Sequence, residues 1–294
     1  MTELEIIALE ATKDILEKNL SIYDEKVKDK KIILVYDLES PLSKLVANWY
    51  IENLKNNKNA EIINFLEIEK EDLKQKLLSL EELSMVIFVS STNFRLDEFR
   101  LRLNLKNSNV WCIEFNHLKY IKDKEIKTYL KAISYNWDFY EKLSNNLKNI
   151  FDNWEKFEVI SSEWNIFEVT WGFEDMKQNT GNFAIENRYW SYPIWENFNE
   201  AKTFSKVNWE LLIKAYPYFD MQVYFPPEPF KLIIKESLVI KTINAPEKFL
   251  EVLEKIKSAE WEIMVRELWF WLNPNIDFEN ILSDVNPFER LEWF

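Results

Sequence analysis

The chain is almost without imidazole and thiol side chains, which are the usual general base and the usual soft metal ligand. Among its 294 residues there is one histidine, His117, and one cysteine, Cys112. One cysteine cannot form an internal disulfide or a multi-cysteine zinc site, and one histidine cannot supply an H-E-x-x-H metal site. A Ser-His-acid triad, a phosphate-binding loop and a G-x-G-x-x-G fingerprint are excluded as well. The sequence therefore rules out several standard catalytic sites.

His117 and Cys112 belong to one apolar segment, VWCIEFNHL. Its pattern places Cys112 inside a strand and His117 at the carboxyl end of that strand, where doubly wound sheets often bind ligands. A lone histidine there is more often a capping or packing residue, and a cysteine inside a strand is more often a buried small hydrophobe. Neither is a leading catalytic candidate.

Two polar stretches have the character of binding loops. The first, STNFRLDEFRLRL from Ser91, could cap a helix and hold an anion, although a solvated face with local ion pairs is the simpler interpretation. The second, residues 173–198, is polar, aromatic and too irregular for a helix or a strand. A long loop of that kind is commonly part of a functional site.

The chain contains two glycines and 13 tryptophans, whereas globular chains average about 7% glycine. Several tryptophans occupy turn contexts: Trp209 where two alternating runs meet at Asn208, Trp171 beside Gly172, and Trp271 before Leu-Asn-Pro. We hypothesise that the gene uses UGA for glycine and that the sequence was written with UGA as tryptophan. Trp171, Trp209 and Trp271 are then expected in turns, exposed or awkwardly packed. The alternative is a protein that is truly rich in tryptophan.

Charge and hydropathy limit the class of partner. The 37 basic and 50 acidic residues give a net charge of −13, the wrong sign for binding a phosphate backbone or an anionic membrane. No apolar run reaches the ~18 residues of a membrane helix, and the acidic opening MTELEIIALEATKD is unlike a signal or transit peptide. We therefore expect a cytoplasmic protein that binds neither nucleic acid nor membrane.

The first half of the chain alternates between apolar runs and amphipathic segments. After a helix over residues 4–20, strands are expected at KIILVYD, AEIINF, MVIFVSS and VWCIEF, each followed by a helical segment. Strands separated by single helices form βαβ units with a parallel sheet. Residues 1–153 are predicted to form a doubly wound α/β domain.

The second half changes to short alternating stretches: KFEVISS, NIFEVTW, ELLIKAY, FKLIIKES and LVIKTI. One helix is expected at PEKFLEVLEKIKSA and a last strand at EIMVREL. This pattern predicts an α+β domain over residues 154–294, with a mostly antiparallel or mixed sheet. No Ser/Gly/Pro linker separates the halves, so the domains are expected to pack firmly.

With tryptophan read as glycine, two segments resemble motifs of the aminopeptidase T family, metal-dependent leucyl aminopeptidases of the thermophilic type and their relatives. YWSYPIWENF, which ends at Phe198, is similar to the aromatic-Pro-x-Gly-Glu-x-Phe motif. EWEIMVRELWFWLNP, which ends at Pro274, is similar to a second motif, in which a strand delivers a glutamate before a glycine-rich turn. The resemblance covers nearly the whole chain from about residue 25. It depends on glycine at four positions, Trp195, Trp261, Trp269 and Trp271.

The resemblance implies a pair of divalent metal ions, with Zn, Co, Mg and Mn all open. Transferred position by position, Glu196 and Glu267 are two of the metal ligands. Hard carboxylates can bridge or flank ions ~3.5 to 4 Å apart, and such ions polarise a scissile carbonyl and activate a bound water. The implied activity is removal of N-terminal residues from peptide substrates by a homodimer. We expect Glu196 and Glu267 to approach each other in one cleft of the second domain.

The end of the chain departs from the family pattern. Family histidine ligands follow the segment corresponding to NPFERLEWF, whereas this sequence ends there and has no histidine after His117. We therefore expect a truncated open reading frame that binds metal weakly and shows little or no peptidase activity. Glu289, Asp284 and Arg266 are candidates for residues that support the ligands or the structure around them.

Two other functions stay open. A related branch of non-haem iron ring-opening dioxygenases uses histidine where this chain has Glu267, so Glu267 favours the peptidase. The third possibility is a non-catalytic binding module, in which Glu196 and Glu267 lie far apart or point into solvent. A carboxyl separation small enough for a shared metal pair would exclude the binding module.

Overall fold

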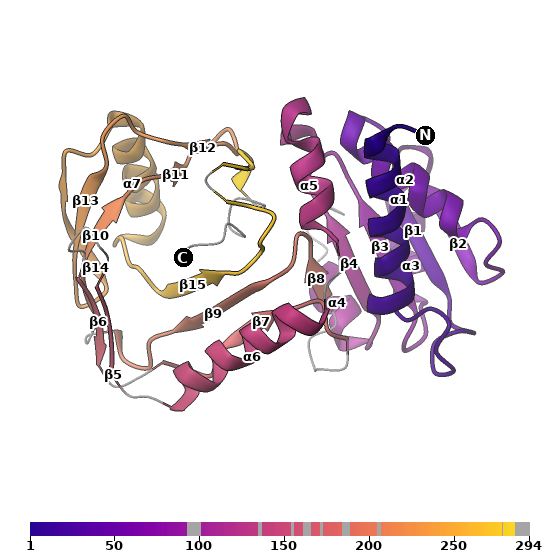
Figure 1. Ribbon diagram of the computed structural model, residues 1–294, viewed down its shortest axis with the longest axis horizontal. Coiled ribbons are helices and arrows are strands. Elements are labelled where there is room, and N and C mark those ends of the chain that lie inside the picture. Colours follow the sequence, from indigo (N-terminus) through magenta and orange to yellow (C-terminus); the bar gives the residue numbers. More distant parts are fainter. Residues whose placement is uncertain are drawn as a thin grey trace.

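The computed structural model describes residues 1–92, 101–134, 137–153, 156–160, 166–170, 173–183, 189–204, 207–277 and 279–285. Two lobes lie side by side, and a smaller sheet runs between them (Figure 1). The N-terminal lobe holds a parallel sheet between two helical layers. The C-terminal lobe holds an antiparallel sheet with one long helix packed against it.

The N-terminal sheet has five parallel strands in the order β2-β1-β3-β4-β8. They are β1 (Ile32–Tyr36), β2 (Ala60–Asn64), β3 (Met85–Val89), β4 (Trp111–Phe115) and β8 (Tyr189–Ser191). β1 and β3 are continuous apolar runs because a sheet covered on both faces buries both sets of side chains. The doubly wound α/β class expected from the sequence is confirmed, and the fifth strand comes from beyond residue 153.

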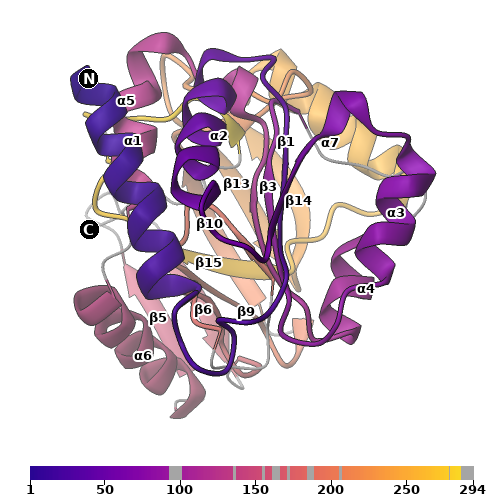
Figure 2. The same cartoon turned by 90° about the vertical axis from the view of Figure 1, so that its right-hand side faces the viewer.

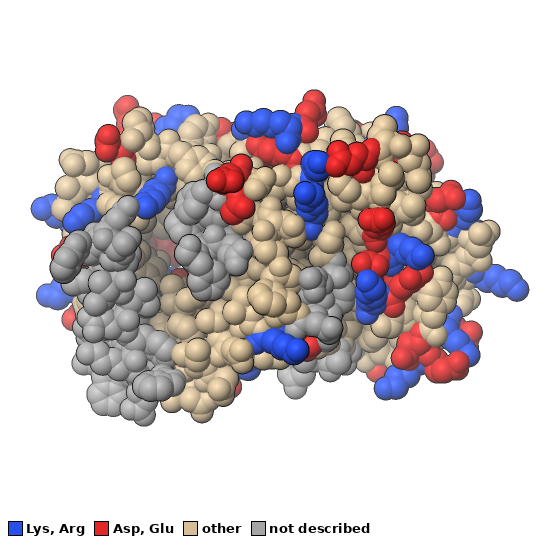
Figure 3. All heavy atoms as spheres, in the orientation of Figure 1, with Lys and Arg blue, Asp and Glu red and all other residues tan. Residues whose placement is uncertain are grey.

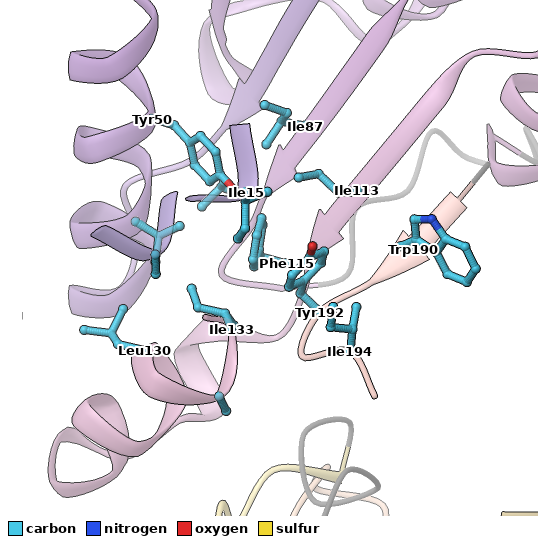
Figure 4. Close-up of a cluster of buried hydrophobic side chains, with 14 of the residues drawn as sticks. Ile15, Tyr50, Ile87, Ile113, Phe115, Leu130, Ile133, Trp190, Tyr192 and Ile194 are labelled. Carbon is cyan, nitrogen blue, oxygen red and sulfur yellow. The ribbon is translucent and has the colours of Figure 1, made fainter. Parts of the chain in front are cut away.

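Helices cover both faces of this sheet (Figure 2). One layer contains α1 (Glu3–Asp14), which a π-helix at Ile15–Asn19 extends, together with α2 (Pro41–Leu54) and α5 (Ile126–Ala132). The other contains α3 (Lys70–Leu78) and α4 (Leu101–Asn107). Alternate residues of β1 pack against the two helical layers. Leu34 belongs to the cluster of Tyr50 and Phe115 that Figure 4 shows, whereas Val35 belongs to the cluster of Leu73 on the other face. Short 3₁₀ turns lie at Phe65–Glu67, Leu118–Tyr120 and Asp123–Glu125.

The C-terminal lobe is built on an antiparallel sheet with the order β14-β13-β10-β6-β5. Its strands are β5 (Lys156–Ile160), β6 (Ile166–Thr170), β10 (Val207–Ile213), β13 (Phe230–Lys235) and β14 (Leu238–Ile243). The helix α7 (Glu247–Glu260) packs on it through Phe249 and Leu253. A two-stranded ribbon, β11 (Tyr216–Pro217) and β12 (Val223–Tyr224), completes the lobe.

A three-stranded antiparallel sheet, here called the bridging sheet, connects the lobes. It contains β7 (Lys177–Asn179), β9 (Glu196–Glu200) and β15 (Glu267–Trp271), in the order β15-β9-β7. The helix α6 (Trp137–Asn153) lies along one of its faces (Figure 1), where the Ser144 hydroxyl donates to Asn197 Oδ1 at 2.5 Å. The opposite face of the bridging sheet carries Glu196 and Glu267, the glutamates of the two sequence motifs.

Four tryptophans among the described residues bear on the expectation of turns, and two of them correct it. Trp209 lies inside β10 opposite Ile234 and Trp271 lies inside β15, so the predicted turns at these two positions are wrong. Their alternating neighbours form regular ladders, which accept a large aromatic side chain readily. Trp195 and Trp261 have φ values of 82° and 69°, in the left-handed region that favours glycine. Trp171 lies outside the described residues.

Charged side chains of both signs are interspersed over the N-terminal lobe on the face seen in Figure 3. In the same lobe, the Glu61 carboxylate pairs across elements, with the ammonium groups of Lys31 and Lys76 each 2.6 Å from one of its oxygens. Within the described ranges, none of the helices is both long enough and apolar enough to cross a membrane.

Candidate functional site

The face of the bridging sheet that lies opposite α6 carries the glutamates of both motifs. The strand register pairs Glu196 with Trp271 and Glu200 with Glu267. Because residues two and four apart on a strand share a face, Glu196, Glu200 and Glu267 all project from the same side of the sheet. We call this side the carboxylate face.

Glu196 is the buried member of the carboxylate face, with 4% of its surface exposed. The Asn179 side chain on β7 donates to Glu196 Oε1 at 2.7 Å and to the Ser191 carbonyl at 3.2 Å. The backbone N–H of Trp195 donates to the Asn179 carbonyl at 2.8 Å. Asn179 thus fixes the orientation of the carboxylate and ties β7 to the ends of β8 and β9. The left-handed residue Trp195 stands directly before Glu196, where the motif has glycine.

Glu267 is half-buried and held from its own strand. The indole N–H of Trp269 donates to Glu267 Oε2 at 3.1 Å. The same indole stacks on Phe198 of β9, with ring centroids 4.3 Å apart and planes inclined by 11°. The aromatic pair stabilises the contact between the two strands and so limits the positions open to Glu267.

Glu200 is a member of the carboxylate face that the sequence interpretation missed. It stands opposite Glu267 in the register, and like charges in directly opposed positions destabilise a sheet. The ammonium of Lys177 lies 3.7 Å from Glu200 Oε1 and 5.6 Å from the Phe198 ring centroid, which offsets this repulsion. The alternation in ENFNE was the signal that could have identified Glu200.

The expectation that Glu196 and Glu267 approach each other is not met. In an antiparallel pair, the first residues of the two strands lie at opposite ends, and four residue steps separate Glu196 from the position opposite Glu267. That spacing is about 13 Å along the strands, too far for two ligands of one metal pair. Among the residues that the structure describes, no three histidine, cysteine, aspartate or glutamate side chains could hold a metal ion together. The described residues therefore do not fit the implied metal pair.

Asp284, Arg266 and Glu289, which the sequence suggested as supports for the metal ligands, have different surroundings. Asp284 is fully buried, and its Oδ2 lies 3.7 Å from Nδ1 of His117 at the edge of the parallel sheet. Arg266 is exposed and lies 3.4 Å from Glu260, the last residue of α7. Glu289 lies outside the described residues.

A second region to consider is the carboxyl edge of the parallel sheet, where doubly wound α/β folds commonly bind ligands. Here Asp37 follows β1 and is 4% exposed. Its carboxylate accepts from the backbone N–H and the hydroxyl of Ser91 at 2.7 and 2.5 Å, and the Ser91 hydroxyl lies 2.8 Å from that of Ser43. His117 is 3% exposed and has a left-handed backbone, consistent with a packing role. The anion site considered in the stretch that begins at Ser91 falls mostly on residues 93–100, which lie outside the described ranges.

Comparisons with known proteins show a fold relationship and no sequence relationship. No family model matches the chain, and no curated protein matches its sequence. The solved structure of 2,5-dihydroxypyridine dioxygenase from Pseudomonas putida is similar with a TM-score of 0.67 and 11% identity, over 97% of this chain and 83% of that one. AmpT from Thermus thermophilus is similar with a TM-score of 0.54 and 10% identity, over 90% and 78%. The chain therefore has an α/β fold that it shares, distantly, with enzymes.

Proposed function

We propose that the chain is a metal-dependent hydrolase of the aminopeptidase T type, which removes N-terminal residues from short peptides. The observation that carries this proposal is that both motif glutamates, Glu196 and Glu267, project from one face of the bridging sheet. The likeness to AmpT over 90% of the chain supports the same function class.

Glu196 and Glu267 are the proposed metal-binding positions, although the described residues do not group around one ion. Glu200 and Glu267 form the half-exposed end of the carboxylate face. Paired carboxylates on one surface attract cations, which include both a divalent metal and the terminal ammonium of a peptide. Glu196, held by Asn179, is the more rigid carboxylate.

The glycine hypothesis belongs to the same proposal. We propose that the native protein carries glycine at Trp195 and Trp261, because both positions have a backbone that glycine adopts without steric cost. The intact mass of the protein from its native host checks this, since each tryptophan replaced by glycine lowers the mass by a fixed amount. A native mass that matches all 13 tryptophans contradicts the hypothesis.

Metal binding and peptide hydrolysis together test the proposed function. We expect Mn²⁺, Co²⁺ or Zn²⁺ to bind weakly in equilibrium dialysis, and any leucine release from leucyl peptides to be slow and to depend on the metal. Glu267→Gln should weaken both. Glu260→Gln is the matched control, because Glu260 is exposed and pairs only with Arg266 among the described contacts. Unchanged metal binding in Glu267→Gln contradicts the assignment.

A ring-opening dioxygenase is the second candidate, favoured by the TM-score of 0.67 over 97% of the chain. It predicts consumption of O₂ and of 2,5-dihydroxypyridine in the presence of Fe²⁺. Leucine release without oxygen consumption supports the peptidase, and the reverse supports the dioxygenase. The separation of Glu196 from Glu267 along the strands is the arrangement expected of a non-catalytic binding module, and the absence of both reactions supports that third alternative.

A further inference from the structure

The outer side of α7 carries a hollow that the proposed function does not use. It has a volume of about 480 Å³ and is lined by residues of α7 and by Phe219 of the turn that joins β11 to β12. Figure 1 shows where α7, β11 and β12 lie in the C-terminal lobe. Its apolar side chains are Phe219, 56% exposed, and Leu250, 39% exposed. Single exposed hydrophobic residues are common, but Phe219 and Leu250 line the same hollow and together offer one apolar contact to a ligand.

The turn between β11 and β12, which forms one side of the hollow, is hydrogen-bonded to α7. The Tyr218 hydroxyl donates to Glu251 Oε2 at 2.6 Å, which ties the turn to α7 and raises the pKa of Tyr218 to about 12. The ammonium of Lys248 lies 3.9 Å from the Tyr224 ring centroid and 4.9 Å from that of Tyr218. A ligand that enters the hollow therefore meets a preformed surface, which lowers the entropy lost on binding.

The rim of the hollow is acidic. Glu247, Glu251 and Glu254 line it, against Lys255 as the basic lining residue. A neighbouring hollow of about 270 Å³ on the β14 side of α7 shares Leu250 and Glu254 with the first hollow and adds Lys241 and Lys257. The three glutamates of the first hollow therefore favour a cationic ligand on the Phe219 side.

We propose that this hollow binds a basic peptide segment of another protein, through an aliphatic or aromatic side chain seated between Phe219 and Leu250. Lysine or arginine residues beside that anchor pair with the glutamates of the rim. An apolar anchor supplies affinity, and the charges supply orientation and a dependence on salt. The proposal is independent of the chemistry on the carboxylate face.

Fluorescence anisotropy with a short fluorescein-labelled peptide of lysine and leucine tests the site. We expect saturable binding that weakens at high salt. The double variant Phe219→Ser with Leu250→Ser should weaken binding about tenfold, equal to about 1.4 kcal/mol. The matched control is Leu66→Ser with Leu78→Ser, because these leucines are 59% and 45% exposed on the N-terminal lobe. Circular dichroism checks that both variants are folded.

A second pair of variants tests the charge. Glu247→Gln with Glu254→Gln should weaken binding and reduce its salt dependence, whereas Glu10→Gln with Glu39→Gln, which removes the same charge from exposed sites on the other lobe, should not. Equal weakening by the site and control pairs overturns the proposal, since the peptide then senses only net charge. Self-association of the unliganded protein that Phe219→Ser with Leu250→Ser abolishes also overturns it, because a second copy is then the occupant.

Discussion

At the scale of single residues, Trp261 has a backbone conformation that a bulky side chain disfavours. It ends α7 in a left-handed conformation, and 88% of its surface is exposed. A left-handed residue with a Cβ costs roughly 1–2 kcal/mol, which glycine avoids. Trp195 has the same backbone problem, but its ring is buried and lies 5.0 Å from the Tyr140 ring, so its loss would also remove packing.

We therefore predict that Trp261→Gly raises the free energy of unfolding by about 1 kcal/mol. Urea denaturation measures the change. Trp261→Ala is the control, because alanine removes the ring but keeps the Cβ that disfavours the left-handed conformation. Equal stabilisation by both substitutions would show that the indole, not the backbone, is the source of the cost.

At the scale of elements, local signals place the helices well. Ser40 and Ser43 form a reciprocal capping box, with backbone-to-hydroxyl distances of 3.1 Å in both directions, and Pro41 occupies the first turn of α2. A strand followed by Ser-Pro therefore predicts where α2 begins. The predicted turn at Trp209 failed because the Asn-aromatic pair can equally continue a strand, and the long-range partner Ile234 decided between the two.

Asn179 stabilises the bridging sheet, because its side-chain amide donates hydrogen bonds both to Glu196 Oε1 and to the Ser191 carbonyl. We predict that Asn179→Ala lowers the free energy of unfolding by about 1–3 kcal/mol, because a buried carboxylate loses a donor. Chemical denaturation measures this. Gln178→Ala on the opposite face is the control, since its amide bonds Ser144 and Asn145 of α6 instead. A smaller loss for Asn179→Ala than for this control would contradict the assignment.

Glu61 gives a pH-dependent contribution to stability at the edge of the parallel sheet. Hydrogen bonds from Lys31 and Lys76 lower the pKa of its carboxyl. Because the folded pKa lies below the unfolded one, about 4.3 for a free glutamate, the stabilisation is present above that value and is lost as pH falls through the folded pKa.

Glu61→Gln should thus cost less than about 1 kcal/mol at neutral pH, since the side chains of Lys31 and Lys76 are 43% and 32% exposed and solvent screens the pairs. The difference from the wild type should vanish in acid. Denaturation curves at several pH values measure it, and a difference that persists at the lowest pH would contradict the ion-pair origin.

At the scale of the whole molecule, the bridging sheet makes the two lobes interdependent. The segment that ends in Ser191 adds β8 to the parallel sheet, and a few residues later Glu196 begins β9. Asn273 donates to the carbonyls of Ala132 and Ile194 at 2.7 and 3.3 Å, which ties the end of β15 to α5. These crossings agree with the expected firm packing of the two halves.

The resemblance to aminopeptidase T predicts a homodimer. Size-exclusion chromatography with light scattering should give twice the mass of the chain. The measurement should be repeated with Phe219→Ser and Leu250→Ser, which we expect to leave the dimer intact because their hollow is assigned to a peptide. A monomer mass at micromolar concentration contradicts the dimer.

The sequence by itself determined the parallel α/β class and the antiparallel second half, because these follow from local periodicity and capping. It missed β9, since Glu196 falls in a stretch interpreted as irregular, and it placed the last strand at EIMVREL, mostly before β15. It could not determine strand register or the association of sequence-distant strands, since both depend on contacts between distant segments. The tertiary structure alone therefore placed Glu200 opposite Glu267, separated Glu267 from Glu196, and paired Asp284 with His117. Antiparallel pairing puts the starts of two strands at opposite ends, and no local pattern carries that information.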